Sequence, residues 1–186
     1  QAEDGIRYPE MSRGLGDVHK RQGVDCVARL LDRKGVRNYM IDIGGELVMK
    51  GENSKMQPWR IGINKPIDDS LAVNQELQTI LQISDAGLAT SGNYRNFYYK
   101  DGKKYAHTID PRTGYPIQHN ILSATVVAQD CATADAYATS FMVLGLDSAK
   151  AICDAHPELD AYFIYTKEDG KTDVYYTEGM KRYIVR

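Results

Sequence analysis

The stretch SATVVAQDCATADAYATSFMVLG, residues 123–145, decides the fold of this chain. Residues 123–129 are rich in valine, which predicts a buried strand. Asp130 is suited to N-cap a helix, and Gly145 is suited to end one. Between them, residues 131–144 place apolar side chains on a single stripe: Ala134, Ala138, Phe141 and Met142. The stretch therefore predicts a buried strand followed directly by a helix with one apolar face.

The rest of the chain adds further helices and strands. Residues 23–34 repeat apolar side chains at i, i+3, i+4 and i+7 before Gly35, which predicts an amphipathic helix. Residues 148–156 predict a second helix, closed by Pro157. Strands are predicted at residues 38–43, 46–50, 59–64, 77–84 and, as a final meander, at 161–165, 173–176 and 181–185.

These elements predict an α+β fold with a mixed or antiparallel sheet and packed helices. One domain is expected over residues 14–186, because the chain is long enough for one good-sized core and short for two. Residues 1–13 show no apolar periodicity and are expected to be an ill-ordered lead-in. Residues 85–94 are mostly small and polar, and they are expected to form a loop that could approach a ligand closely.

Composition argues against several classes of protein. The 186 residues carry a formal net charge of −2 without a basic cluster, which argues against binding to nucleic acid or to an anionic membrane. No apolar run approaches transmembrane length. The three cysteines, Cys26, Cys131 and Cys153, are widely spaced, and their spacing indicates neither a CxxC metal site nor a fully paired disulfide framework.

A second stretch, HTIDPRTGYP at residues 107–116, combines polar side chains with rigid turn residues. It follows a predicted β-hairpin whose turn is Asp101-Gly102, so His107 is expected near the end of a strand. Asp110-Pro111 and Thr113-Gly114 predict a turn whose backbone can approach a ligand, with a positive φ at Gly114 and with Arg112 facing solvent. The alternative is an ordinary turn that ends the hairpin and carries a surface histidine.

Asp135 and Thr139 lie four residues apart on the predicted helix, so both side chains project from one face. A carboxylate and a hydroxyl can together bind a hard cation such as Mg2+, whose remaining ligands are commonly waters and substrate phosphates. The alternative is a structural pair, in which Thr139 bonds back to a helix carbonyl and Asp135 caps a neighbouring group.

In combination, these segments resemble the ApbE family of FAD:protein FMN transferases. Residues 107–116 look like the family's His-x-x-Asp-Pro-x-Thr-Gly-x-Pro motif, and residues 134–139 look like its Ala-Asp-x-x-Ala-Thr helix. Gly44-Gly45, residues 58–66 and residues 91–94 are similar to further family segments. The resemblance runs from about residue 15 to the C-terminus and does not include the family's N-terminal half, which supplies part of the FAD pocket.

The resemblance implies a T-fold-like α+β enzyme that requires Mg2+, splits FAD and attaches FMN to a threonine of an acceptor flavoprotein. It implies that His107 is the base that takes the proton of the acceptor hydroxyl. The metal ligands would be Asp135, Thr139 and the backbone carbonyl of Asp17. The remaining implied residues bind the flavin nucleotide: Lys20, Ile109, Asp110, Thr113 and Gly114.

The chain departs from the family in the turn expected before the first helix. Gly14 stands where an aspartate that contacts FAD is expected, Asp17 stands where the family has a small residue, and Arg21 stands in place of glycine. The alternatives are therefore a flavin or nucleotide binder without catalysis, or an incomplete fragment of the transferase. The resemblance also suggests an extracytoplasmic, membrane-associated lipoprotein at the periplasm or cell surface.

Overall fold

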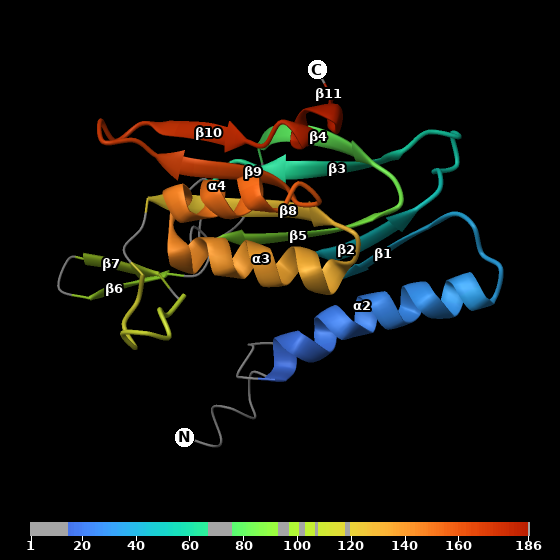
Figure 1. Cartoon of the computed structure of the whole chain (residues 1–186), viewed down its shortest axis with the longest axis horizontal. Coiled ribbons are helices and arrows are strands. Elements are labelled where there is room, and N and C mark those ends of the chain that lie inside the picture. The colour runs from blue at the N-terminus through green and yellow to red at the C-terminus, as the bar shows by residue number, and fades with distance from the viewer. Residues whose placement is uncertain are drawn as a thin grey trace.

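The computed structural model describes residues 15–66, 76–92, 97–100, 103–106, 108–117 and 120–185; for residues 15–22, 97–100 and 103–106 it describes the backbone alone. Figure 1 shows the α+β architecture that the sequence predicts. The helices are α2 (Leu15–Arg33), α3 (Cys131–Leu144), α4 (Leu146–Ala155) and the 3-10 helix η1 (Gly179–Arg182). The strands are β1 (Tyr39–Ile43), β2 (Glu46–Lys50), β3 (Trp59–Asn64), β4 (Leu77–Ile83), β5 (Ala86–Gly92), β6 (Phe97–Lys100), β7 (Lys103–Ala106), β8 (Ile121–Ala128), β9 (Asp160–Thr166), β10 (Thr172–Tyr176) and β11 (Ile184–Val185).

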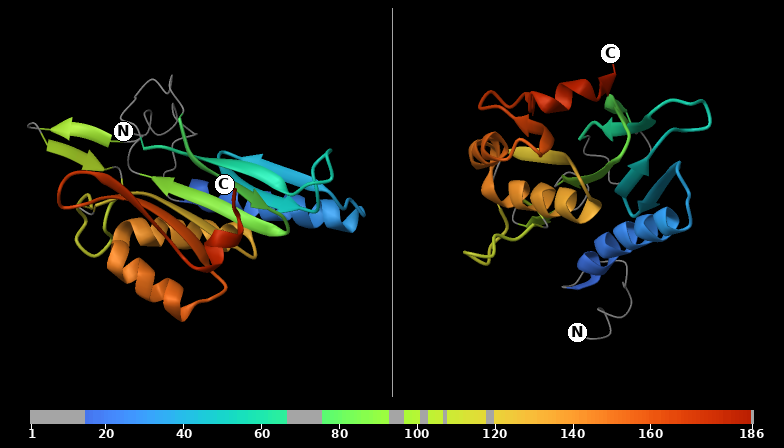
Figure 2. Two further views of the ribbon diagram at one scale, coloured as in Figure 1. Left: turned by 90° about the horizontal axis from the view of Figure 1, so that it is seen from above. Right: turned by 45° about the vertical axis from the view of Figure 1, so that its right-hand side comes forward.

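A six-stranded antiparallel sheet lies at the centre of the fold, in the order β1-β2-β5-β8-β9-β10. The helices α3 and α4 cover one face, and a three-stranded sheet, β11-β4-β3, covers the other (Figure 2). The hairpin β6–β7 pairs as predicted and forms a separate two-stranded sheet. Every pairing between these strands is antiparallel, so the antiparallel alternative of the prediction is the correct one.

The two faces of the central sheet bury two different cores. Val126 of β8 packs toward the helices with Phe141 and Phe163, whereas its neighbour Val127 packs toward the three-stranded sheet with Leu81. All five side chains are almost completely buried. Because neighbouring side chains of a strand point to opposite faces, a strand covered on both faces must be apolar throughout. This explains the valine-rich run.

The stretch that follows β8 folds as the sequence predicts. The side chain of Asp130 accepts a hydrogen bond from the Thr133 amide at 2.7 Å, which is the expected N-cap. Helix α3 occupies the predicted residues, and its predicted stripe is buried in the helix-side core. Gly145 ends the helix with φ at 83°, a conformation that favours glycine, and its amide donates to the Phe141 carbonyl at 3.1 Å.

The prediction of a loop at residues 85–94 was wrong. Within the described part of this segment, residues 86–92 form β5, which lies between β2 and β8 in the central sheet. Alanine, glycine and serine have little intrinsic preference for strands, so their run resembles a loop in the sequence. They form a strand here because α3 packs directly on it, and only small side chains fit beneath that helix.

The first helix also differs from its prediction. It begins at Leu15 instead of residue 23, so the turn expected over residues 14–21 is helical wherever it is described. Val24 and Ala28 of the predicted stripe are buried against β1 and β2, but Val27 is exposed, because the buried face is narrower than the apolar stripe. Gly35, with φ at 76°, ends the helix as predicted.

The C-terminal segment does not complete the predicted meander. Residues 181–185 instead form the end of η1 and the short strand β11, which pairs with β4 in the three-stranded sheet. An ion pair between Arg182 and the buried Asp160 of β9 holds this segment on the central sheet. In the part of the chain that is described, none of the helices has the length and apolar character needed to span a membrane.

Candidate functional site

Helix α3 lies directly on β5, and glycine sets the distance between them. A Cβ atom added to Gly87 would lie 2.3 Å from the Cys131 amide nitrogen, closer than real Cβ atoms approach. Further along, the Ser91 hydroxyl oxygen lies 3.1 Å from the Thr139 hydroxyl oxygen. The four strand positions from Gly87 to Ser91 and the eight helix positions from Cys131 to Thr139 each span about 12–13 Å. The helix therefore follows β5 in the same direction, as Figure 1 shows.

Asp135 occupies the middle of this interface. Its position, halfway between Cys131 and Thr139, places it over β5 near the fully buried Ala89. The Asp135 side chain is 4% exposed, and Thr139 is partly buried one turn further along the helix. The predicted pair thus lies on one face of α3, and the structure adds the Ser91 hydroxyl to it. Sequence reasoning did not assign Ser91 a role, because the segment that contains it was expected to be a loop.

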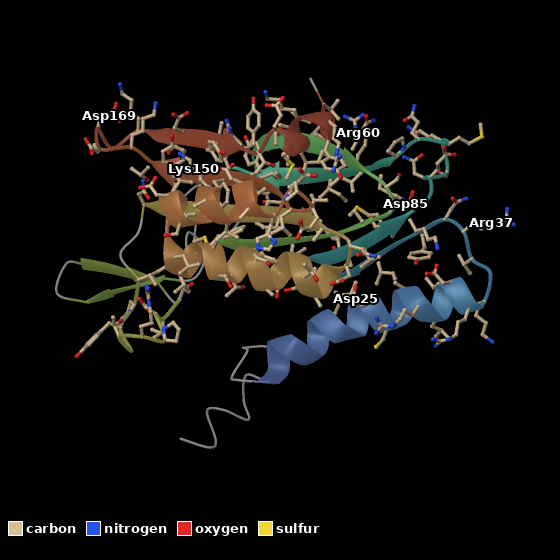
Figure 3. The ribbon with its side chains drawn as sticks, in the orientation of Figure 1. Asp25, Arg37, Arg60, Asp85, Lys150 and Asp169 are labelled. Carbon is tan, nitrogen blue, oxygen red and sulfur yellow. The ribbon has the colours of Figure 1, made fainter. Side chains whose placement is uncertain are left out.

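A second carboxylate fixes the beginning of α3. Asp25 of α2 is 7% exposed, and its two carboxylate oxygens accept hydrogen bonds from the amides of Cys131 and Ala132, each at 3.0 Å. Figure 3 shows Asp25 on the side of α2 that faces α3. Amides in the first turn of a helix lack partners within it, and a carboxylate there also stabilises the helix dipole. The sequence gives no local signal for this contact, because Asp25 and Cys131 lie 106 positions apart in the chain.

The surroundings of the beginning of α3 also change the pKa of the Cys131 thiol. Burial, reinforced by the neighbouring carboxylates of Asp25 and Glu46, raises the pKa of the Cys131 thiol to about 12. A thiol with this pKa stays protonated at neutral pH and is a poor nucleophile or metal ligand. Cys131 is fully buried and packs in the core between α2, β1 and β2.

The loop Thr108–Ile117 closes as a short hairpin. The Asp110 amide donates to the Tyr115 carbonyl at 2.9 Å, and the Ile117 amide donates to the Thr108 carbonyl at 3.1 Å. These two bonds flank the bridge between Ile109 and Pro116. In this antiparallel arrangement, the backbone N–H and C=O of Ile109 point away from the hairpin. The backbone of Ile109 is therefore directed outward, where a ligand can reach it.

Local interactions hold the tip of this loop. The Asp110 carboxylate accepts a hydrogen bond from the Arg112 amide at 2.9 Å and two from its guanidinium, at 3.0 and 2.8 Å. The prediction that Arg112 faces solvent is confirmed, since its side chain is 65% exposed, but it is also held by Asp110. That contact raises the pKa of Arg112. Gly114 has φ at 73°, the positive value that the sequence suggested.

The loop and the α3–β5 interface approach one another at one end of the molecule. Ile117, at the end of the loop, is buried in the helix-side core with Ala138 and Phe141. Figures 1 and 2 show the loop beside the end of the central sheet where β5 and α3 finish. At Ile117, the end of the loop therefore packs in the same core as the helix that carries Asp135 and Thr139.

The remaining predicted site residues are described in part or not at all. His107 lies outside the described residues, directly after β7. Asp17 and Lys20 lie in the first turns of α2, whose backbone is described there without the side chains. Thr113 is exposed at the loop tip and accepts a hydrogen bond from the Tyr115 amide at 3.3 Å. Among the residues that the structure describes, no three His, Cys, Asp or Glu side chains gather in a metal-binding group.

Comparisons with known proteins point to a single family. The model of the ApbE family matches residues 5–163. The FAD:protein FMN transferase of Vibrio cholerae is 42% identical over 162 residues, which cover 87% of this chain and 47% of the relative. The enzyme of the same name from Escherichia coli K12 is 38% identical over 177 residues, which cover 95% of this chain and 49% of the relative.

Solved structures show the same relationship. The flavin transferase ApbE from Vibrio cholerae superposes with a TM-score of 0.75 at 39% identity, covering 88% of this chain and 50% of that one. The ApbE protein from Thermotoga maritima gives a TM-score of 0.75 at 26% identity, covering 92% and 53%. The chain spans about half the length of the curated relatives it matches. Because the family model matches most of its residues, the chain belongs to the ApbE family.

Proposed function

We propose that this chain takes part in the Mg2+-dependent transfer of FMN from FAD to a threonine of an acceptor flavoprotein. The observation that carries the proposal is the placement of Asp135 and Thr139 on one face of α3, beside the end of the loop Thr108–Ile117. The α3–β5 interface offers oxygen ligands, and the loop offers the outward-facing backbone of Ile109. Two relatives named FAD:protein FMN transferase support the reaction class.

The donor atoms of the α3–β5 interface suit Mg2+. Asp135 offers carboxylate oxygens, and Thr139 offers a hydroxyl oxygen, both from a rigid helix that the sheet supports. Magnesium prefers oxygen ligands and commonly completes its shell with water and phosphate oxygens, so few protein ligands are needed. The Asp17 carbonyl is the third ligand in this proposal. When bound, the ion would neutralise negative charge on the pyrophosphate of FAD.

The loop is proposed to bind the flavin nucleotide. The outward N–H and C=O of Ile109 can form hydrogen bonds with it, while the bonds of Asp110 and the turn at Gly114 keep that backbone in place. Thr113 adds an exposed hydroxyl at the tip, and Lys20 supplies a positive charge for a phosphate. These contacts bind and orient FAD rather than take part in bond cleavage.

His107 is proposed as the base. The hydroxyl oxygen of the acceptor threonine attacks the phosphorus atom on the FMN side of the pyrophosphate and forms a new P–O bond. The bond to the AMP phosphate breaks, AMP leaves with its electron pair, and the hydroxyl proton passes to His107. A histidine suits this role because its ordinary pKa lies near neutral pH.

A transfer assay tests this proposal. The chain is incubated with FAD, Mg2+ and an acceptor flavoprotein, and covalent flavin fluorescence is measured on the acceptor after denaturing electrophoresis. The control is the acceptor with its target threonine changed to alanine. His107→Ala is expected to lower transfer by about a hundredfold or more while FAD binding persists, because a base acts mainly in the transition state. Transfer by His107→Ala at the wild-type rate would contradict its role.

A second candidate function is FAD binding without transfer. It is favoured by the three positions at which the chain departs from the family pattern, Gly14, Asp17 and Arg21. Quenching of FAD fluorescence by the chain, with no covalent flavin on the acceptor, would identify this function. Whether the protein works as a lipoprotein outside the cytoplasm is a separate proposal, and cell fractionation of the native protein tests it.

A further inference from the structure

We propose that Ser91 is a positioning residue for the metal ligand Thr139, an inference that rests on the proposed Mg2+ site. The observation is the contact of 3.1 Å between the hydroxyl oxygens of Ser91 and Thr139. It joins the central strand β5 to the helix that carries Asp135. Ser91 itself belongs neither to the predicted ligand set nor to the loop.

The strand geometry aims Ser91 at the helix. Ser91 is paired with Ala124 of β8, and two residues earlier on the same face lies Ala89, which packs in the helix-side core. Thr90, between them, points to the opposite face, where its hydroxyl lies 2.8 Å from that of Thr125. The alternation of a strand therefore places one hydroxyl pair at the proposed metal site and another, chemically similar pair away from it.

The function of Ser91 follows from the hydrogen-bonding capacity of a hydroxyl group. Thr139 has one proton and two lone pairs, and a metal ion can use only a lone pair. The proton must point elsewhere, and the Ser91 oxygen lies at the right distance to accept it. A threonine within a helix can otherwise turn its hydroxyl toward the carbonyl four residues earlier, which here belongs to Asp135. Ser91 holds the Thr139 hydroxyl toward the strand instead, with a lone pair available to Mg2+.

Because the site is buried, Thr139 depends more strongly on the hydrogen bond with Ser91. Asp135 is 4% exposed, and Ser91 and Thr139 are partly buried, so water competes poorly for their hydrogen bonds. Residues that orient metal ligands without touching the metal commonly change metal affinity by about tenfold to a hundredfold when they are replaced. We expect Ser91→Ala to weaken Mg2+ binding by about tenfold.

Isothermal titration with Mg2+ measures the affinity of four proteins: the wild type, Ser91→Ala, Thr90→Ala and Asp135→Asn. Thr90→Ala is the matched control, because it removes a hydroxyl from the neighbouring position of β5 that bonds Thr125 on the other face. It is expected to bind Mg2+ as the wild type does. Asp135→Asn tests the metal site itself and is expected to abolish binding. Melting temperatures without Mg2+ show whether Ser91→Ala and Thr90→Ala perturb the fold to a similar degree.

A double-mutant cycle separates positioning from a general structural effect. Thr139→Val keeps the shape of threonine and removes its hydroxyl, so Ser91→Ala should have less than about a twofold further effect on Mg2+ affinity in that background. An equal loss in both backgrounds would overturn the inference. Normal Mg2+ binding by Ser91→Ala would also overturn the inference about Ser91. If Asp135→Asn had lost Mg2+ binding in the same experiment, the metal site of the proposed function would still stand. Absence of Mg2+ binding by the wild type would overturn both the role of Ser91 and the proposed metal site.

Discussion

The two halves of the candidate site are held in place by different forces. The α3–β5 interface is buried, and its geometry depends on Gly87 beneath the helix and Asp25 at its beginning. The loop Thr108–Ile117 is largely exposed and depends on hydrogen bonds between residues close in sequence, such as those of Asp110. Disturbing the first half should therefore reduce global stability, whereas disturbing the second should act mainly on ligand binding.

The largest effect is expected from Gly87→Ala. The new Cβ would lie 2.3 Å from backbone atoms of Asp130 and Cys131, which cannot move without shifting α3. We expect the free energy of unfolding to fall by about 3 kcal/mol, measured by urea denaturation. Gly23→Ala is the matched control: among the described residues, an added Cβ meets only Ile43, at 3.9 Å, and alanine favours the helix, so the stability should stay equal or rise. Equal stability in both variants would contradict the close packing of α3 on β5.

Asp25→Ala should have the next largest effect. It leaves one buried and one partly buried amide without their carboxylate partner, and we expect the free energy of unfolding to fall by about 2 kcal/mol. Alkylation of Cys131 provides a local measurement, because its thiol is fully buried and burial raises its pKa to about 12. The exposed Cys26 serves as the reference thiol within the same protein. Cys131 should react faster in the variant, and an unchanged rate would show that Asp25 does not hold the start of α3.

Gly114→Val should affect the loop half more than the fold. With φ at 73°, a β-branched residue is strained although no described residue beyond its two chain neighbours lies within 4 Å of an added Cβ, and the cost is about 1–2 kcal/mol. The loop can escape the strain by changing conformation, so FAD affinity, measured by fluorescence titration, should fall more than the melting temperature. Gly114→Asn, which tolerates positive φ better, should retain more FAD affinity. Unchanged FAD binding in the valine variant would remove this loop from the flavin site.

The smallest effect is expected from Arg112→Ala. The side chain is 65% exposed, and although it forms two hydrogen bonds with Asp110, exposed ion pairs contribute little because water and salt screen them. The melting temperature should not differ measurably from that of the wild type. FAD affinity should fall less than in Gly114→Val, since the Asp110 carboxylate keeps its bond to the backbone amide of residue 112. A larger loss of FAD affinity than in Gly114→Val would indicate that the guanidinium itself contacts the nucleotide.

Features set by neighbouring residues were predictable from the sequence. The N-cap at Asp130, the ends of α3, the hairpin β6–β7 and the positive φ of Gly114 are all confirmed. Each depends on interactions within a few residues, which the order of residue types records directly. The pairing of Asp135 with Thr139 on one helix face is of the same kind.

Tertiary structure alone decided the features that combine distant segments. Residues 86–92 became a central strand because α3 requires small side chains beneath it, and Asp25 became a cap because α2 lies beside the start of α3. Ser91 reached Thr139 for the same reason. The sequence determined which groups are candidates for the proposed chemistry and which turns hold them. Only packing could determine their neighbours, because contacts between residues distant in the chain leave no local pattern in it.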